Sequence, residues 1–263
     1  MRVLVTGATG TLGRPTVQAL RASGATVRVL SRRAAAAHGD DAWCGVEWAR
    51  GEFTTGAGVD DALRGVDVVV HAAHDRDSAE RDVAGVRLLL EAAERARVAR
   101  VVYVSIVGAR HVPGVAYYAG KKGGEEVALA SRIGAVFRAT QFHDFVDELL
   151  HRSDRLPRAL VLPKGVRAQP VDVGDCAVAL ACYALAPAPP THDFAGPEVL
   201  DVGALAEQWL AARGERKRVF EVPAPGPALR AIAAGALTSD VAERGRTTWR
   251  TWLARTYSSA PGR

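Results

Sequence analysis

Three glycines in one short loop constrain this sequence more than any other feature. Gly7, Gly10 and Gly13 lie between the apolar segment Arg2–Thr6 and the amphipathic segment Thr11–Ser23. This order predicts a β-strand, a tight turn and an α-helix. Such glycines let the backbone approach a pyrophosphate, which the free N–H groups at the helix start would bind. The residues expected at the cofactor are Gly7, Thr9, Gly10, Thr11, Leu12 and Gly13.

Strand and helix patterns alternate after this loop. The β-branched runs lie at 26–31, 46–49, 67–71, 100–105 and 135–138. Strands separated by helices of this length predict an α/β fold with a doubly wound parallel Rossmann sheet. We expect residues 1–140 to form this core and residues 141–263 to form a small, mostly helical C-terminal substrate lobe. Within that lobe, residues 168–185 are expected to return to the core.

The end of the second predicted strand indicates which dinucleotide binds. A carboxylate at this place would accept hydrogen bonds from the adenine ribose hydroxyls of NAD. The sequence here is Ser31-Arg32-Arg33, which offers no carboxylate. Arginine forms charge-assisted hydrogen bonds with phosphate, so these residues favour NADP(H) over NAD(H).

Several motifs resemble those of the short-chain dehydrogenase/reductase superfamily, and more narrowly its atypical NmrA-like branch of NAD(P)-binding proteins. The motifs are Thr6–Gly13, Asp67–Ala73, Asp82–Val86, Val101–Gly108 and Tyr117–Lys121. The resemblance implies that Ala72 and Ala73 lie beside the adenine and its ribose. It also implies that Glu52 and Phe53 lie near the adenine, where the family usually has Asp followed by an apolar residue.

A tyrosine and a lysine in the last of these motifs suggest acid–base chemistry. Tyr117 and Lys121 are four residues apart, so they share one face of a helix. A free tyrosine titrates near ~10, and a nearby cation lowers that pKa. The resemblance implies that Tyr117 is the general acid and base and that Lys121 holds the nicotinamide ribose. Tyr118 and Lys122 repeat the spacing on another face of the helix.

A serine completes the catalytic set that the resemblance implies. Ser105 lies at the end of the fifth predicted strand. In catalytic relatives the hydroxyl that contacts the substrate usually lies two positions later, where this sequence has Val107. Ser105 is therefore either a substrate donor or a contact of the cofactor alone.

Two polar residues follow the sixth predicted strand. Gln141 and His143 come directly after it, at the sheet edge where ligands of such folds bind. We expect both to contact the substrate, with His143 able to act as an acid or a base.

These features predict an NADP(H)-dependent oxidoreductase that transfers hydride to or from a small carbonyl, alcohol or activated double bond. Two alternatives stay open. One is an epimerase, isomerase or dehydratase that uses its cofactor transiently. The other is a non-catalytic redox sensor of the NmrA-like kind that binds a protein partner. The missing hydroxyl at Val107 favours the sensor, and the Tyr117/Lys121 pair favours an enzyme.

Composition narrows the partners to small molecules. The net charge is +5, but the arginines are scattered and lack the aromatic interleaving typical of nucleic-acid binding. Apolar runs such as Val101–Val107 are too short to span a membrane. Three cysteines without a C-x-x-C spacing predict a reduced, cytoplasmic protein without a metal site. The resemblance adds the expectation of a possible homodimer.

Overall fold

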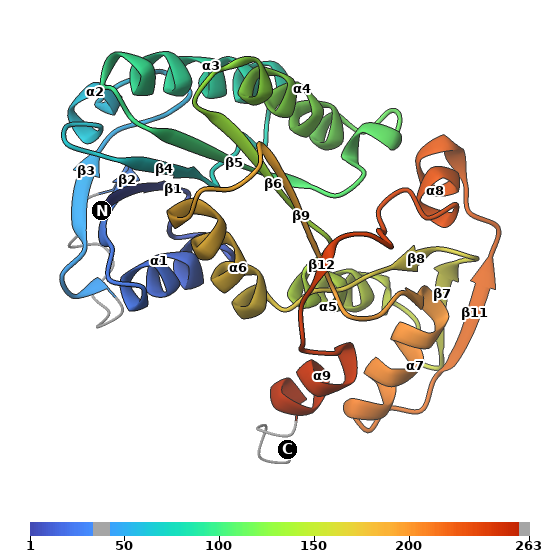
Figure 1. The fold of residues 1–263 in the computed structure, drawn as a ribbon. Helices are drawn as coiled ribbons and strands as arrows, with labels where there is room; N and C mark the ends of the chain where they lie inside the picture. Colours follow the sequence, from blue (N-terminus) through green and yellow to red (C-terminus); the bar gives the residue numbers. More distant parts are fainter. Residues whose placement is uncertain (34–42, 258–263) are drawn as a thin grey trace. The chain divides into compact units, whose positions relative to one another are not determined.

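The computed structural model describes residues 1–33 and 43–257, and its contacts divide the chain into two compact units (Figure 1). Unit 1 contains Met1–Ser105, Ala116–Arg138 and Cys176–His192. Unit 2 contains Ile106–Val115, Ala139–Asp175 and Asp193–Arg263. This division differs from a single boundary at residue 140. Ile106–Val115 belongs to unit 2, and Cys176–His192 belongs to unit 1.

An eight-stranded sheet runs in the order β12-β9-β6-β5-β4-β1-β2-β3 within the described residues. In chain order its strands are β1 (Arg2–Thr6), β2 (Thr26–Ser31), β3 (Glu47–Arg50), β4 (Val68–His71), β5 (Arg100–Ile106), β6 (Gly134–Ala139), β9 (Thr191–Ala195) and β12 (Glu243–Arg244). Strand β1 pairs in parallel with β2 on one side and with β4 on the other. The strand order therefore reverses at β1, and ligands of doubly wound sheets bind at such a reversal. The predicted Rossmann sheet is confirmed.

Helices cover both faces of the sheet in unit 1 (Figure 1). On one face lie α2 (Val59–Ala62), α3 (Ala79–Arg95) and α4 (Ala116–Ala130), and on the other lie α1 (Gly13–Ala22) and α6 (Val173–Leu185). Strand β4 is buried along its whole length, as expected of a strand covered on both sides. None of the helices in residues 1–33 and 43–257 is long and apolar enough to cross a membrane.

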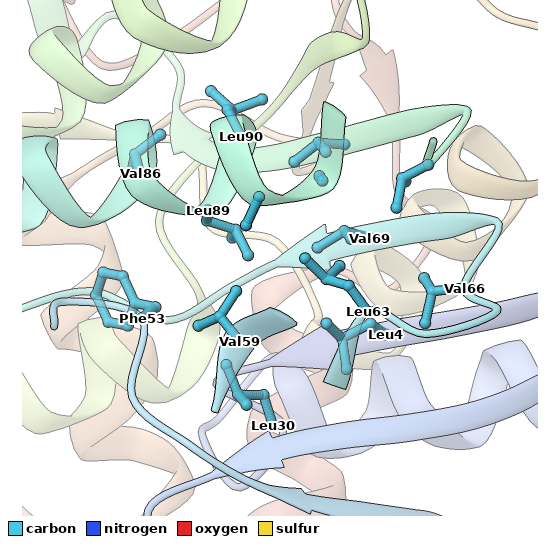
Figure 2. Packing of buried hydrophobic residues seen from close by; sticks show 14 of the residues in the cluster. Leu4, Leu30, Phe53, Val59, Leu63, Val66, Val69, Val86, Leu89 and Leu90 are labelled. Carbon is cyan, nitrogen blue, oxygen red and sulfur yellow. The ribbon is translucent and has the colours of Figure 1, made fainter. Parts of the chain in front are cut away.

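Apolar packing fixes the helices of unit 1 on the sheet. Leu4 of β1, Val69 of β4 and Leu89 of α3 belong to one buried cluster, shown in Figure 2. Glycines in α4 allow α3 to approach closely, since a Cβ at Gly123 would lie 2.7 Å from Cγ2 of Val83. Helix α4, which carries the Tyr117/Lys121 pair, is therefore fixed against α3.

Unit 2 has its own core between helices and two small sheets. The elements are α5 (His143–Ser153), β7 (Ala159–Pro163), β8 (Arg167–Ala168), β10 (Leu200–Asp201), α7 (Val202–Ala212), β11 (Arg218–Val222), α8 (Gly226–Ala233) and α9 (Trp249–Tyr257). Strands β7 and β11 are parallel, and β8 and β10 are antiparallel. Trp209 and Trp249 are buried in the core of this unit.

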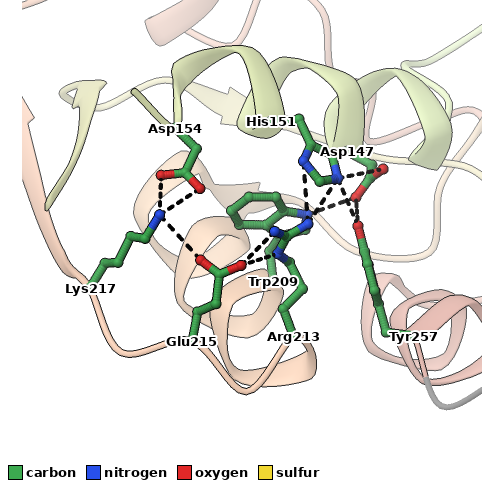
Figure 3. Close-up of polar contacts among 8 residues, drawn as sticks. All are labelled: Asp147, His151, Asp154, Trp209, Arg213, Glu215, Lys217 and Tyr257. Atoms are coloured by element: carbon green, nitrogen blue, oxygen red, sulfur yellow. Dashed lines mark hydrogen bonds and ion pairs between the residues drawn. The ribbon is translucent and has the colours of Figure 1, made fainter. Parts of the chain in front are cut away.

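Polar contacts tie the helices of unit 2 together at one side (Figure 3). Asp147 of α5 accepts a hydrogen bond of 2.7 Å from the Trp209 indole of α7. The Arg213 guanidinium lies 4.3 Å from the centre of the same indole ring. Lys217 donates to the Asp154 carboxylate at 2.6 Å and 2.7 Å. These contacts fasten the segment after α7 to the end of α5.

Several element boundaries depart from the sequence pattern for local reasons. Helix α3 begins at Ala79 because the Ser78 hydroxyl accepts a hydrogen bond from Arg81 N. Helix α1 begins at Gly13, two residues later than Thr11. An aspartate directly before a helix predicts a side-chain cap. Asp201 is the N-cap residue of α7 but makes no side-chain cap hydrogen bond, so that prediction is wrong.

Candidate functional site

The glycine loop after β1 is shaped by close backbone approach. Gly7 has φ of +69°, and a Cβ there would lie 2.5 Å from Ala73 N. A Cβ at Gly13 would lie 2.1 Å from the Gly7 carbonyl oxygen. The turn closes through a hydrogen bond of 2.9 Å from Gly10 N to that same oxygen. Any side chain at Gly7 or Gly13 would therefore displace the loop from the strand ends.

The rest of the loop presents backbone to solvent ahead of α1. Thr9, Gly10 and Thr11 are exposed, whereas the Leu12 side chain is buried in the core. The first turn of α1 carries no acidic residue, so nothing there opposes the positive end of the helix dipole. A helix start with exposed glycine backbone and no carboxylate fits a pyrophosphate.

Two arginines lie at the end of β2. Arg32 and Arg33 are exposed, and the Arg33 N–H donates to the Ser31 hydroxyl at 3.1 Å. Arg32 Nη1 lies 3.9 Å from Glu52 Oε1, which places the two sequence-predicted groups side by side. Arginines at this strand end suit an added phosphate on the adenine ribose.

The ends of β3 and β4 provide a mostly apolar wall. Phe53 is buried and meets the His71 ring edge-on, with ring centres 4.8 Å apart. Ala72 and Ala73 are partly buried, and Ala73 N donates to the Thr6 hydroxyl at 3.4 Å. Because β1 and β4 are neighbours, this alanine pair lies against Gly7.

The two residues of the Tyr117/Lys121 pair have different surroundings. Lys121 is 4% exposed and donates to the Val104 carbonyl at 3.0 Å. Burial lowers the pKa of Lys121 to about 8, although the Asp82 and Glu125 carboxylates act in the opposite direction. The neighbouring Lys122 is exposed and pairs with Glu126. Only Lys121 lies in the interior beside the ends of the strands.

Tyr117 remains accessible at the start of α4. Its side chain is 46% exposed, and its ring lies 5.4 Å from the His74 ring, centre to centre. Partial burial raises the pKa of the phenol to about 12, with a smaller contribution from Tyr118. The phenol therefore stays protonated near neutral pH, which makes it a proton donor rather than a base in this state.

Ser105 is placed differently from a substrate donor. It is 2% exposed, and its hydroxyl donates to Glu125 Oε1 at 2.6 Å. Glu125 also accepts two hydrogen bonds, of 2.9 Å and 2.8 Å, from Arg138 of β6. The Ser105 hydroxyl is thus bound within a buried ion pair. Val107, at the position where relatives carry their hydroxyl, is buried and apolar.

Sequence reasoning assigned no role to Glu125, Arg138, Asp82 or His74. Glu125 lies four residues after Lys121, and a carboxylate on that face of α4 was the available signal. Asp82 is buried and accepts a hydrogen bond of 2.8 Å from Asp75 N. Burial raises the pKa of Asp82 and lowers the pKa of His74 to about 4.

Gln141 and His143 lie in unit 2. The Gln141 amide is hydrogen-bonded there, and His143 is buried. The Gln141 amide donates to Leu237 O at 3.0 Å and accepts from Gln169 N at 3.1 Å. His143 has no exposed surface and packs against both Trp249 and Trp252, whose rings stack on each other. Burial lowers its pKa to about 4. Neither side chain is free to meet a substrate in this arrangement.

Comparisons with known proteins also indicate an NAD(P)H-binding domain. Residues 7–142 match the sequence model of a family described as NAD(P)H-binding. Sterol demethylase protein B from Methylococcus capsulatus is 41% identical over an alignment of 117 residues that covers 41% of this chain and 35% of that protein. The matched part thus spans about a third of that relative.

Three solved structures share the fold over nearly the full length. A nucleoside-diphosphate-sugar epimerase from Staphylococcus aureus has a TM-score of 0.79 at 20% identity, covering 96% of this chain and 99% of that one. The triphenylmethane reductase of Citrobacter has a TM-score of 0.78 at 20% identity, covering 98% and 100%. The NADPH-dependent quinone oxidoreductase of Escherichia coli, complexed with NADPH, has a TM-score of 0.76 at 16% identity, covering 97% and 99%.

Proposed function

Because this chain belongs to the NAD(P)H-binding family, we propose that it is an NADP(H)-dependent reductase of conjugated, electron-poor acceptors such as quinones. The bound cofactor supplies the hydride. The other groups needed are a pyrophosphate cradle, a ribose anchor and a proton donor. Unit 1 offers a residue or loop for each.

The loop Gly7–Gly13 would hold the pyrophosphate. Its backbone runs so close to the strand ends and to itself that a Cβ at Gly7 or Gly13 would clash with neighbouring backbone atoms. Arg32 and Arg33 would hold the 2′-phosphate of the adenine ribose. Lys121 would anchor the nicotinamide ribose, since it is buried beside the strand ends and uses one of its three N–H groups on Val104 O.

One observation carries the choice of acceptor: the Ser105 hydroxyl is bound to Glu125. Reduction of an isolated carbonyl forms an alkoxide, which needs hydrogen-bond donors aimed at the oxygen. With Ser105 engaged and Val107 apolar, Tyr117 is left as the proton donor at this edge among the predicted catalytic residues. A conjugated acceptor spreads the incoming charge over its own π-system and needs less stabilisation from the protein.

The structural neighbours support the same chemistry. One reduces quinones with NADPH and another is a triphenylmethane reductase, according to their names. Both share the fold with this chain. The likeness to a sugar epimerase keeps the fold compatible with other uses of the cofactor.

The test is NADPH oxidation, followed at 340 nm, with a para-quinone, an α,β-unsaturated ketone and a saturated ketone. We expect turnover in that order and little with the saturated ketone. Ser105→Ala should retain activity within about threefold, and Tyr117→Phe should lower kcat about tenfold or more. Efficient reduction of the saturated ketone that disappears in Ser105→Ala would contradict the proposal.

The closed Ser105 contact also favours a second function, the non-catalytic redox sensor. The same assay separates the two. Binding of NADPH without turnover of any acceptor, together with different affinities for the reduced and oxidised cofactor, would support the sensor.

A further inference from the structure

Glu52 lies at a fixed position beside the end of β2. Its N–H donates to Ala57 O at 2.8 Å, and the preceding Gly51 N–H donates to Ser31 O at 3.0 Å. A Cβ at Gly51 would lie 2.7 Å from a methyl carbon of Leu30, so the two strand ends are pressed together. The backbone of Glu52 is therefore set by β2 itself.

The Glu52 carboxylate is also held in place. The Thr54 hydroxyl donates to Oε1 at 3.0 Å, and the same oxygen lies 3.9 Å from Arg32 Nη1. The Glu52 side chain is 31% exposed, whereas that of Arg32 is 78% exposed. The carboxylate is thus the more fixed partner, and the guanidinium is the one that can move.

A carboxylate at this place acts oppositely on the two dinucleotides. A 2′-phosphate that binds Arg32 brings about two negative charges near Glu52 and competes with it for the guanidinium. A 2′-hydroxyl brings no charge, and a carboxylate can accept a hydrogen bond from it. The same residue therefore weakens one ligand and tolerates or supports the other.

We propose that Glu52 limits the preference of this protein for NADP(H) over NAD(H) by holding Arg32 and by repelling the 2′-phosphate. This rests on the proposed function only in requiring that a nicotinamide dinucleotide binds in unit 1. A carboxylate that only contacted the adenine would change the affinities for both dinucleotides equally. The ratio of the two affinities therefore isolates the effect on the 2′ position.

The experiment is calorimetric titration of the full chain with NADPH, NADH, 2′,5′-ADP and 5′-AMP. We expect Glu52→Gln to tighten NADPH and 2′,5′-ADP about threefold to tenfold. The variant should bind 5′-AMP, which carries a 2′-hydroxyl like NADH, equally or more weakly. NADH should bind equally or more weakly. Thr54→Val, which removes the hydroxyl that holds the carboxylate, should shift the NADPH-to-NADH ratio in the same direction by less.

Asp60→Asn provides a matched control, since Asp60 is an exposed carboxylate paired with Arg95 at 2.9 Å in the same unit. It should leave the ratio unchanged. The gain in Glu52→Gln should shrink in 1 M NaCl, where the Debye length falls to about 3 Å. An unchanged ratio in Glu52→Gln, with wild type binding NADPH, overturns the inference alone. Failure of wild type to bind either dinucleotide overturns the proposed function and this inference together.

Discussion

Gln169 of unit 2 and two buried residues of β4 and β5 in unit 1 differ in how their hydrogen-bonding groups are satisfied. In unit 2 the Gln169 amide donates to Gly196 O and Ser239 O and accepts from Ser239 N, so its hydrogen-bonding groups are used. In unit 1 His71 Nε2 and Tyr103 Oη are buried without a hydrogen-bond partner among the described residues. Lys121 Nζ lies 4.9 Å from the centre of the Tyr103 ring.

This difference distinguishes a residue with a structural role from residues that have hydrogen-bonding groups to spare. Buried polar groups in proteins are normally paired, so a fully used amide reads as a structural clamp. His71 is the last residue of β4, and ligands of parallel sheets bind beyond the carboxyl ends of the strands. We therefore expect ligand binding in unit 1 and a structural role for Gln141 and Gln169.

The largest expected effect tests the glycine loop. Gly7→Ala places a Cβ 2.5 Å from Ala73 N, and we expect NADPH affinity to fall about 100-fold or more. Gly24→Ala is the matched control, because Gly24 has a similar φ of +80° with nothing within 4 Å of the added Cβ. It should cost about 1–2 kcal/mol of stability and leave binding intact. Equal NADPH affinity of the two variants would show that the loop does not bind the cofactor.

The next effect concerns Lys121. Lys121→Met should weaken NADPH binding about tenfold to 100-fold, whereas Lys122→Met, at an exposed ion pair, should change it less than about twofold. Because the folded pKa of Lys121 is about 8, its cation is lost as pH rises through 8. NADPH affinity measured from pH 6 to pH 9.5 should fall in wild type above pH 8 and stay flat in Lys121→Met. A flat wild-type profile would argue against Lys121 as the anchor.

His143 is the exception within unit 2, since its ring makes no hydrogen bond of normal geometry within the described residues. Its folded pKa of about 4 lies below the value of 6.5 expected when unfolded. The unfolded chain therefore binds the proton first, and stability falls as pH drops from 6.5 towards 4, by about 1.4 kcal/mol per pH unit.

His143→Phe should remove this loss. We expect little change in urea unfolding at pH 7 and a gain of about 2 kcal/mol over wild type at pH 4.5. NADPH affinity should not change. If the variant instead loses reductase activity with its stability intact, His143 acts on the substrate after all.

Replacing Gln169 should likewise have little effect on binding. Gln169→Leu leaves Ser239 N and Gly196 O without their partner and should cost about 1–3 kcal/mol in unfolding free energy. The NADPH dissociation constant should stay within about twofold. A large loss of affinity at unchanged stability would blur the distinction between the two units.

The sequence predicts the parts of the molecule that depend on local spacing. The glycine intervals before Gly13 and the alternation of strands and helices predicted the parallel sheet, because these signals lie within one strand–turn–helix unit. The i, i+4 spacing of Tyr117 and Lys121 predicted a shared helix face. These inferences need no knowledge of distant residues.

The engagement of Ser105 could not be predicted in the same way. It depends on Glu125 of α4, which lies 20 residues after Ser105. Glu125 in turn is held by Arg138 of β6, 13 residues further along the chain. The burial of His143 depends on Trp249 and Trp252, more than 100 positions further along the chain. Neither neighbourhood leaves a periodic signal in the sequence.

We propose that unit 1 binds a nicotinamide dinucleotide carrying a 2′-phosphate. Titration of the wild-type chain with NADPH and with NADH tests it directly. We expect a micromolar dissociation constant for NADPH and a weaker one for NADH. Absence of heat or fluorescence change with both dinucleotides at millimolar concentration would contradict the claim.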